Sequence, residues 1–223
     1  MTELLQGGLF ITFEGTEGSG KTTQMERLIA KLEQAGYPVT RTVEPGGTEI
    51  GRQIRRILLD SKNSGLAPTA ELLLYFASRA QNVAEVIRPA LTQGRAVVCD
   101  RFTDSTLVYQ GAGRGLGGES IEALHTIACS ALQPDITIYL DIDLETGLGR
   151  AFERNRAAAD GPDETRLDNE ALEFHRRVRE AYLSLAVRVR PRFRVIDASG
   201  TMEAVAQSVW NAVAPALESR RVR

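Results

Sequence analysis

The amino-acid sequence predicts an α/β fold with three layers, in which helices flank a parallel sheet of five strands. Two observations support this prediction: short apolar runs alternate with helical periodicity, and a glycine-rich turn joins the first run to a helical pattern. Alternation of this kind is typical of parallel sheets with crossover helices on both faces. A chain of 223 residues can bury one large core, so we expect residues 1–223 to form a single domain.

The expected strands are short and rich in apolar or β-branched residues, as buried strands of parallel sheets are. They are residues 9–14, 37–43, 96–99, 136–140 and 193–196. Apolar residues at helical spacing mark the main intervening helices, near residues 25–36, 69–91, 118–132 and 205–217. Ligands of such sheets bind outside the carboxyl ends of the strands, so the residues that follow each strand are candidate site residues.

The turn after the first strand fits the pattern G-x-x-x-x-G-K-[ST], a P-loop. Its backbone N–H groups can surround phosphate oxygens, and the following helix N-terminus adds partial positive charge. Lys21 can reach the β- and γ-phosphates, and the Thr22 hydroxyl can bind Mg²⁺. The motif therefore predicts a Rossmann-like P-loop fold that binds a nucleoside triphosphate. The expected binding residues are Gly15, Thr16, Glu17, Gly18, Ser19, Gly20, Lys21, Thr22 and Thr23.

Charged residues follow the other expected strands. Asp100 and Arg101 close the third strand, where the acid can hold Mg²⁺ or its waters and the arginine can clamp a phosphate. A plain salt pair at a strand end is the alternative. Glu44 begins the loop Glu44-Pro45-Gly46-Gly47-Thr48 after the second strand, and Asp197-Ala198 follows the fifth.

Residues 69–91 read as one helix, on which Tyr75, Arg79 and Asn82 fall at i, i+4 and i+7. They therefore share one side of the helix. An aromatic ring one turn from an arginine can clamp a planar base, the ring by stacking and the arginine by hydrogen bonds. The alternative is a solvated face with one packed tyrosine, because aromatic residues at helical spacing are usually part of the core.

A second basic cluster, Arg150, Arg154 and Arg156, follows the fourth strand. Arg150 and Arg154 lie one helical turn apart, and like charges at that spacing slightly destabilise a bare helix. They are better explained by an anion that they face, with a solvated basic face as the alternative. The small, polar segment 157–163 reads as a loop, so we expect a lid at about residues 150–166.

Composition limits the partners and the compartment. The net charge of −2 gives no global basic field for nucleic acid or a membrane, and no apolar run is long enough to span a bilayer. Cys99 and Cys129 lie in apolar contexts, which suggests buried thiols in a reducing compartment, and we expect a cytoplasmic protein. His125 and His175 have no evident acidic or nucleophilic partner in the sequence, so we expect them on helix surfaces.

Taken together, these residues resemble bacterial thymidylate kinases, P-loop nucleoside monophosphate kinases that convert dTMP to dTDP with ATP. The resemblance covers nearly the whole chain. It depends on residues 13–23, 44–48, 75–81 and 101–111, with smaller matches at Gly113-Arg114-Gly115, Pro134-Asp135, Arg166-Leu167-Asp168 and Asp197-Ala198. It implies an ATP-Mg²⁺-dependent kinase that supplies dTTP for DNA synthesis, and family members are commonly homodimers.

The resemblance implies a role for each candidate residue. Lys21 and Thr22 would handle the ATP phosphates and Mg²⁺, with Asp100 as a second metal residue. Arg101, helped by Arg55, would hold the dTMP phosphate, and Arg154 would close on the transferred phosphoryl group. Glu17 would meet the acceptor's 3′-hydroxyl or a metal-bound water. On the acceptor side, thymine would be contacted by Tyr75, Arg79, Ser105, Thr106 and Gln110, and the deoxyribose by Tyr109, while Glu44 would also lie on this side. Arg150 and Ala198 would lie on the adenine side.

The sequence departs from the family pattern at three positions. Tyr75 stands where phenylalanine is common, so its hydroxyl needs a partner. Phe152 stands where some relatives carry a lid arginine, and Val43 stands where arginine often precedes Glu44. An acid in the P-loop and an arginine in the lid resemble the bacterial subtype rather than the subtype with an arginine in the P-loop.

The residues leave two other functions open. One is a kinase of the same architecture that acts on another nucleotide or nucleoside. The other is a P-loop ATPase that serves as a switch, which would need no pocket for a second substrate.

The helices near 69–91 and 118–132 carry apolar faces that are candidates for a dimer interface.

Overall fold

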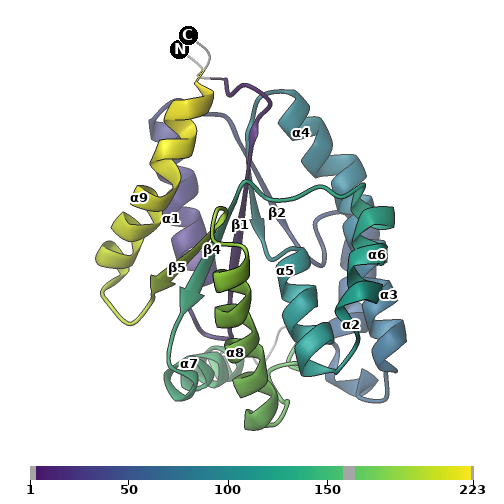
Figure 1. The fold of residues 1–223 in the computed structure, drawn as a ribbon. Helices are drawn as coiled ribbons and strands as arrows, with labels where there is room; N and C mark the ends of the chain where they lie inside the picture. Colours follow the sequence, from purple (N-terminus) through teal and green to yellow (C-terminus); the bar gives the residue numbers. More distant parts are fainter. Residues whose placement is uncertain (1–3, 158–163, 222–223) are drawn as a thin grey trace.

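A computed structural model describes residues 4–157 and 164–221, and these form three layers (Figure 1). The central sheet has five parallel strands in the order β2-β3-β1-β4-β5, which confirms the predicted fold class. The strands are β1 (Leu9–Gly15), β2 (Val39–Val43), β3 (Ala96–Asp100), β4 (Ile136–Asp141) and β5 (Phe193–Asp197). Each lies within two residues of its predicted bounds.

The helices are α1 (Lys21–Gln34), α2 (Glu49–Leu59), α3 (Pro68–Asn82), α4 (Arg88–Thr92), α5 (Thr103–Thr106), α6 (Gly118–Cys129), α7 (Leu144–Ala157), α8 (Leu172–Arg188) and α9 (Met202–Arg220). Three short pieces of other helix types accompany them: the 3₁₀ turn η1 (Ser61–Asn63) and the π-helical turns η2 (Val83–Ile87) and η3 (Leu107–Gly113). No helix of the described chain is long and apolar enough to cross a membrane.

The two faces of the sheet are covered by different helices because side chains alternate along each strand. Leu9, Ile11 and Phe13 of β1 point toward α1 and α9 and form the largest core cluster with them. Phe10, from the opposite face of β1, packs with residues of η2 and α4. Figure 1 shows α1 and α9 on one side of the sheet and α3, α4 and α6 on the other.

The helix predicted over residues 69–91 is interrupted by one wide turn. It is built from α3, η2 and α4 in succession, so the backbone stays helical but widens at Val83–Ile87. Pro89 explains the change, because a proline inside a helix removes an amide donor and its ring clashes with the carbonyl of the preceding turn. A π-helical turn relieves that clash.

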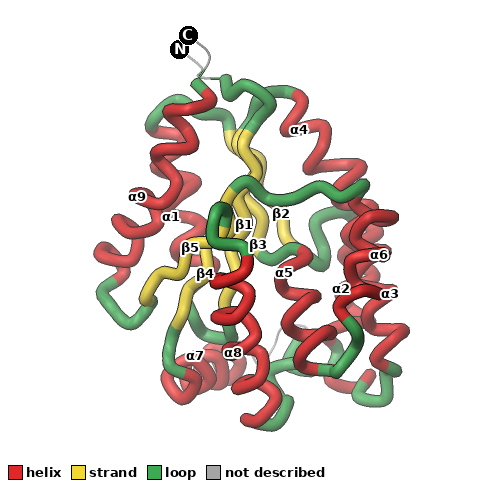
Figure 2. Tube along the Cα trace, in the orientation of Figure 1, coloured by secondary structure: helices red, strands yellow, loops and turns green. Residues whose placement is uncertain are grey.

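Because all five strands run in the same direction, their carboxyl ends meet at one edge of the sheet. This edge lies toward α7 and α8, at the lower end of Figure 2. At the opposite end, Leu5 and Arg221 pair in an antiparallel bridge that brings the two ends of the described chain together. The segments after β1, β2 and β3 therefore meet at the edge where a site is expected.

Candidate active site

A cavity of about 890 Å³ opens at the carboxyl edge of the sheet. The P-loop, the Glu44 loop, the polar side of α3, the segment after β3 and the end of α7 all contribute to its walls. Of the predicted site residues, it is lined by Glu17, Gly18, Ser19, Gly20, Lys21, Thr22, Thr23, Glu44, Arg55, Tyr75, Arg79, Asp100, Arg101, Ser105, Thr106, Tyr109, Gln110, Arg150 and Arg154. Predicted site residues from positions 17 to 154 of the chain thus line one cavity.

Three predicted residues are not among the lining residues. Gly15 and Thr16 lie behind the cavity, where their carbonyl oxygens accept hydrogen bonds from Lys21 Nζ at 3.0 and 2.9 Å. Ala198 is buried in the core cluster beside α9, and its amide donates to the Asp141 carbonyl at 2.8 Å. The structure therefore does not bring Ala198 to the predicted binding site, because β5 ends in packed core at that point.

The P-loop backbone takes a shape that only glycine permits at two positions. Gly18 and Gly20 have φ angles of 66° and 85°, in the left-handed region. A Cβ on Gly18 would lie 1.9 Å from the Gly147 carbonyl oxygen, so α7 approaches the loop too closely for any side chain. The loop ends where α1 begins at Lys21, so the positive end of the helix dipole faces the cavity.

Lys21 is buried, with one arginine and three carboxylates close enough to affect its charge. Burial, and then the nearby Arg101 charge, lower the pKa of Lys21 to about 8. Its ammonium group is held by the Gly15 and Thr16 carbonyls rather than by a carboxylate. An anion in the loop would restore the charge balance of this lysine, as expected of a phosphate site.

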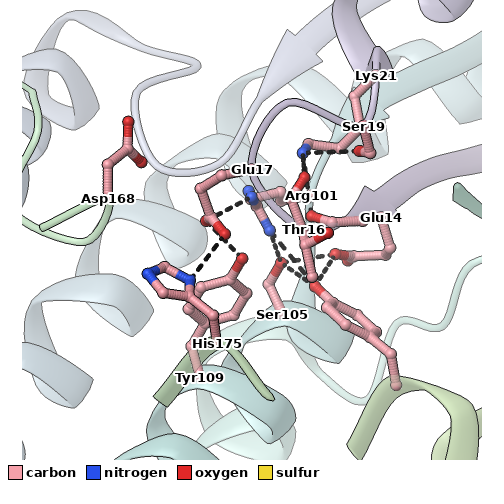
Figure 3. Close-up of polar contacts among 12 residues, drawn as sticks. Glu14, Thr16, Glu17, Ser19, Lys21, Arg101, Ser105, Tyr109, Asp168 and His175 are labelled. Atoms are coloured by element: carbon pink, nitrogen blue, oxygen red, sulfur yellow. Dashed lines mark hydrogen bonds and ion pairs between the residues drawn. The ribbon is translucent and has the colours of Figure 1, made fainter. Parts of the chain in front are cut away.

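Glu14, the last side chain of β1 before the loop, organises the segment after β3 (Figure 3). Its carboxylate accepts hydrogen bonds from the Phe102 amide at 2.9 Å, the Ser105 hydroxyl at 2.6 Å and the Tyr182 hydroxyl at 2.7 Å. Burial, and then the neighbouring Asp104, raise the pKa of Glu14. Neither Glu14 nor Tyr182 was predicted as a site residue, although an acid inside a buried strand must find partners.

Arg101 lies at the centre of the polar network in Figure 3. Its Nη1 donates to the Ser105 hydroxyl at 3.1 Å and to the Tyr182 hydroxyl at 3.4 Å, and its guanidinium lies 4.9 Å from the Tyr109 ring centre. Its Nη2 lies 3.5 Å from Glu17 Oε1. The φ of 67° is unusual for arginine, and strained backbone of this kind occurs often at functional sites.

Glu17 faces two cations and one hydroxyl. The Tyr109 hydroxyl donates to Oε1 at 2.7 Å, and His175 Nδ1 lies 3.3 Å from Oε2. Burial opposes ionisation, but contact with His175 and then the Arg101 and Lys21 charges lower the pKa of Glu17 to about 2. The carboxylate is therefore ionised at neutral pH.

The prediction that both histidines lie on helix surfaces is wrong. His175 is 0% exposed and faces Glu17. His125 is also buried: its Nδ1 lies 2.9 Å from the Thr103 hydroxyl, and its Nε2 lies 3.0 Å from the side-chain amide nitrogen of Gln133. The helical spacing of α8 does indicate that His175 is buried, because it lies three residues before Val178 and seven before Tyr182, on the buried face. Its acidic partner lies 158 positions away, which no local spacing reveals.

The other wall of the cavity carries the predicted base clamp. Arg79 is only 1% exposed and donates to the Thr106 hydroxyl at 2.9 Å and to the Phe102 carbonyl at 3.3 Å. Tyr75 lines the same wall, and burial raises the pKa of Tyr75 to about 12, so it stays protonated. Aromatic ring and guanidinium thus share one side of the cavity, as their spacing predicts.

Glu44 lies behind this arginine. Its Oε2 is 3.7 Å from Arg79 Nε, while Asn82 donates to Oε1 from the next turn of the helix. Burial raises the pKa of Glu44 to about 7, despite the Arg79 charge and the Asn82 hydrogen bond. Asn82 also accepts the Thr42 hydroxyl at 2.8 Å, so it ties the Glu44 loop to α3.

Ion pairs connect residues of the predicted lid with neighbouring segments of the cavity lining. Arg55 forms a two-pronged contact with Glu164, at 2.8 and 2.7 Å, and Arg154 lies 3.2 Å from Asp168. Most of the predicted loop 157–163 lies outside the described residues. Phe152, at the position where relatives can carry a lid arginine, is 49% exposed.

The donor set at the cavity suits Mg²⁺. The Thr22 hydroxyl and the Asp100 carboxylate are both oxygen ligands on the lining, and Mg²⁺ is usually held by one or two protein groups with waters and phosphates. No group of three or more His, Cys, Asp or Glu side chains in residues 4–157 and 164–221 could hold a metal ion alone. These residues fit a metal that arrives with a nucleotide rather than one held in a protein cage.

Comparison with known proteins places this geometry in context. The model of the family described as "Thymidylate kinase" matches residues 13–209. The thymidylate kinase of Pelobacter propionicus is 53% identical over 213 residues, 96% of this chain and 95% of that protein. That of Solidesulfovibrio magneticus is 54% identical over 205 residues, 92% and 98% of the two chains. The crystal structure of a thymidylate kinase from Ehrlichia chaffeensis matches with a TM-score of 0.73 and 33% identity, covering 93% of this chain and 99% of that one.

Proposed function

The chain belongs to the thymidylate kinase family, and we propose that it transfers the γ-phosphoryl group of ATP to the phosphate of dTMP. The products are dTDP and ADP, and dTDP is the precursor of dTTP for DNA synthesis. One observation carries the proposal: the cavity that the P-loop lines is also lined by Arg101, which suits a second anion, and by Tyr75 and Arg79, which suit a planar base. A site for one nucleotide would not need that second set of groups.

On the donor side, residues 15–23 hold the triphosphate. Their N–H groups and the N-terminus of α1 surround the phosphates, and Lys21 moves from the loop carbonyls to the β- and γ-phosphates. When bound, Mg²⁺ neutralises charge on the phosphate oxygens, and Thr22 and Asp100 would hold it. Arg150 contributes to the adenine side, and Arg154 closes on the transferred group within a lid at about residues 150–166.

On the acceptor side, Arg101 and Arg55 hold the dTMP phosphate. The Tyr75 ring stacks on thymine, while Arg79 donates to its O4 edge. Thr106, Ser105 and Gln110 complete the base pocket, and Tyr109 lies against the deoxyribose, where it leaves no room for a 2′-hydroxyl. Glu17 binds the 3′-hydroxyl, and Glu44 supports Arg79 at 3.7 Å.

The chemistry is an in-line displacement. A phosphate oxygen of dTMP attacks the γ-phosphorus, and the bond from that phosphorus to the β,γ-bridging oxygen breaks as ADP leaves. A phosphate monoester has a second pKa of about 6, so the attacking oxygen is ionised at neutral pH and needs no strong base. Positioning and charge neutralisation by Lys21, Arg101 and Arg154 supply the catalysis.

A panel of acceptors tests this function. The purified chain is incubated with ATP-Mg²⁺ and, separately, dTMP, dUMP, dCMP, dAMP, dGMP or thymidine, and ADP release is followed. We expect the highest kcat/KM with dTMP. A higher kcat/KM with another acceptor would identify that acceptor as the substrate. Slow ATP hydrolysis that no acceptor accelerates would favour the switch function.

We also propose that the chain acts as a homodimer in the cytoplasm. Leu73 of α3 and Ile127 of α6 are 51% and 79% exposed, which suits an interface on these helices, although Leu72, Phe76 and Ile121 pack between the two helices. Cys99 and Cys129 are free and buried, as expected in a reducing compartment. Sedimentation of the native chain beside an Ile127→Glu variant tests the dimer, since the variant should sediment as a monomer.

A further inference from the structure

We propose that His175 is a positioning residue that holds the Glu17 carboxylate, so that Arg101 stays available for the phosphate of the acceptor nucleotide. The inference rests on the proposed function and assigns a role to a side chain that touches neither nucleotide in it. Figure 3 shows the arrangement: Glu17 lies between the His175 ring on one side and Arg101 on the other.

The position of His175 requires an explanation, because a fully buried imidazole is costly without partners. Its side chain comes from α8, 0% exposed, and neither ring nitrogen has a hydrogen bond of normal geometry within the described chain. Nδ1 lies 3.3 Å from Glu17 Oε2, and that oxygen also lacks a hydrogen bond. The two polar atoms thus face each other across the interface between α8 and the P-loop.

The other oxygen of Glu17 is in contact with the acceptor site. Oε1 accepts the Tyr109 hydroxyl at 2.7 Å and lies 3.5 Å from Arg101 Nη2. If the carboxylate loses the cation on its Oε2 side, Arg101 is the cation that remains in contact with it within the described residues, and Lys21 adds its charge without an ion-pair contact. Glu17 would then compete with the acceptor phosphate for the same guanidinium.

The net charge of these side chains leads to the same conclusion. With an imidazolium at His175, the trio of His175, Glu17 and Arg101 carries one net positive charge, and without it the trio is neutral. A dianionic phosphate that approaches Arg101 meets a net positive charge in the first case, whereas in the second the Arg101 charge is already balanced by Glu17. We therefore expect His175 to act on acceptor binding more than on the rate of transfer.

The surroundings of His175 favour its protonated form. Burial lowers the pKa of His175, but Glu17 from the P-loop and Asp168 from the segment before α8 raise it further, so the net direction is upward. Beyond them, Lys21 and Arg101 lie on the far side of Glu17, and Arg154 pairs with Asp168 at 3.2 Å. The Asp168 backbone also favours the protonated ring, and the Phe174 ring lies against it at 5.7 Å between centroids.

Two variants separate charge and hydrogen bonding from packing. His175→Phe keeps a ring and removes both nitrogens, while His175→Asn can place an N–H donor where Nδ1 lies. We expect His175→Phe to raise the Kd and KM for dTMP by on the order of tenfold, with kcat and the KM for ATP changed by less than about threefold. His175→Asn should recover part of the loss. Arg176→Gln, at the exposed neighbour that pairs with Glu173, is the matched control and should leave all constants unchanged.

A double-variant cycle tests whether the effect passes through Glu17. In a Glu17→Gln background, His175→Phe should weaken dTMP binding by less than about twofold. Equal losses in both backgrounds would overturn the inference, as would a His175→Phe variant that binds dTMP as the native chain does. Thermal unfolding of each variant identifies a global loss of structure, which would lower the affinities for ATP and dTMP together.

A pH series supplies a readout that packing alone would not move. In the native chain the Kd for dTMP should increase as the pH rises through the raised pKa of His175, and the His175→Asn variant should lack that step. A step that persists unchanged in the variant would contradict the inference. Transfer to dTMP by the native chain, measured in the same series, tests the proposed function separately from the effect of His175.

Discussion

Arg101 Nη2 and Glu17 Oε1 lie 3.5 Å apart, so an ion pair joins the residue after β3 to the P-loop. The pair connects the two proposed halves of the cavity, because Glu17 belongs to the loop proposed to bind the donor phosphates and Arg101 is proposed to bind the acceptor phosphate. Tyr109 and His175 hold the same carboxylate from two further elements, η3 and α8. Charge at the centre of the site is therefore balanced among side chains before any nucleotide binds.

The lid arginine should act on the rate rather than on acceptor binding. Arg154 is largely exposed, and within residues 4–157 and 164–221 it contacts Asp168 and Asn155, so it is available to move onto the transferred phosphoryl group. We expect Arg154→Ala to lower kcat on the order of 10³-fold and to change the KM for dTMP by less than about threefold. Steady-state kinetics measure both, with Arg156→Ala, which removes an exposed arginine of the same helix, as the control. An unchanged kcat with a raised KM would remove Arg154 from catalysis.

Tyr109 should determine the choice between deoxyribose and ribose. Its ring lies under Arg101 and its hydroxyl is fixed by Glu17, so the side chain cannot yield to an extra hydroxyl on the sugar. Tyr109→Ala should lower the ratio of kcat/KM for dTMP over the ribonucleotide analogue by about tenfold. The comparison needs both acceptors at the same ATP concentration. A ratio equal to that of the native chain would place sugar selection elsewhere.

Glu71 should be important for stability. Its buried carboxylate accepts Gln110 Nε2 at 2.8 Å and pairs with Arg166 at 2.7 Å and Arg114 at 3.3 Å. Glu71→Gln leaves the buried Arg166 guanidinium without this anion and leaves Arg114 to its other partner, Glu170, which should lower the free energy of unfolding by about 3–5 kcal/mol. Denaturant unfolding at neutral pH measures the loss, and Glu173→Gln, at an exposed pair, should cost less than about 1 kcal/mol. Equal small losses in both variants would contradict the role of Glu71.

Glu44 should make the protein less stable as the pH rises from about 4.5 to about 7. Burial raises the pKa of Glu44 from 4.5 to about 7, so the folded chain holds a proton that the unfolded chain has released in that range. Stability from this group is complete below pH 4.5 and is lost through pH 7, by up to about 3 kcal/mol. The free energy of unfolding is measured at pH 5 and pH 8 for the native chain and for a Glu44→Gln variant. Between these two pH values the native chain should lose more stability than the variant, by up to that amount. Parallel pH dependences would mean that Glu44 ionises normally.

Local patterns in the sequence predicted the strands, the position of the P-loop between β1 and α1, and the placement of Tyr75 and Arg79 on one cavity. The strands are marked by runs such as Leu9–Phe13 that only burial explains, and Tyr75 and Arg79 share a face because helical geometry fixes their spacing. Elements that a few neighbouring residues determine can be recognised without the structure.

The partners of Glu14 and Glu17 could not be predicted in this way. Tyr182 is 168 positions from Glu14, and only the packing of α8 across β4 brings the two together. The wide turn at Val83–Ile87 was missed for another reason, since a proline within a helical pattern predicts a defect but not its form.

Transfer of the phosphoryl group itself tests the central claim most directly. ATP labelled with radioactive phosphorus at the γ-position is incubated with the chain, Mg²⁺ and dTMP, and the products are separated. If the cavity is a two-substrate site, the label appears in the β-phosphate of dTDP in amounts equal to the ADP formed. Label that appears only in inorganic phosphate, with dTMP unchanged, would contradict the account.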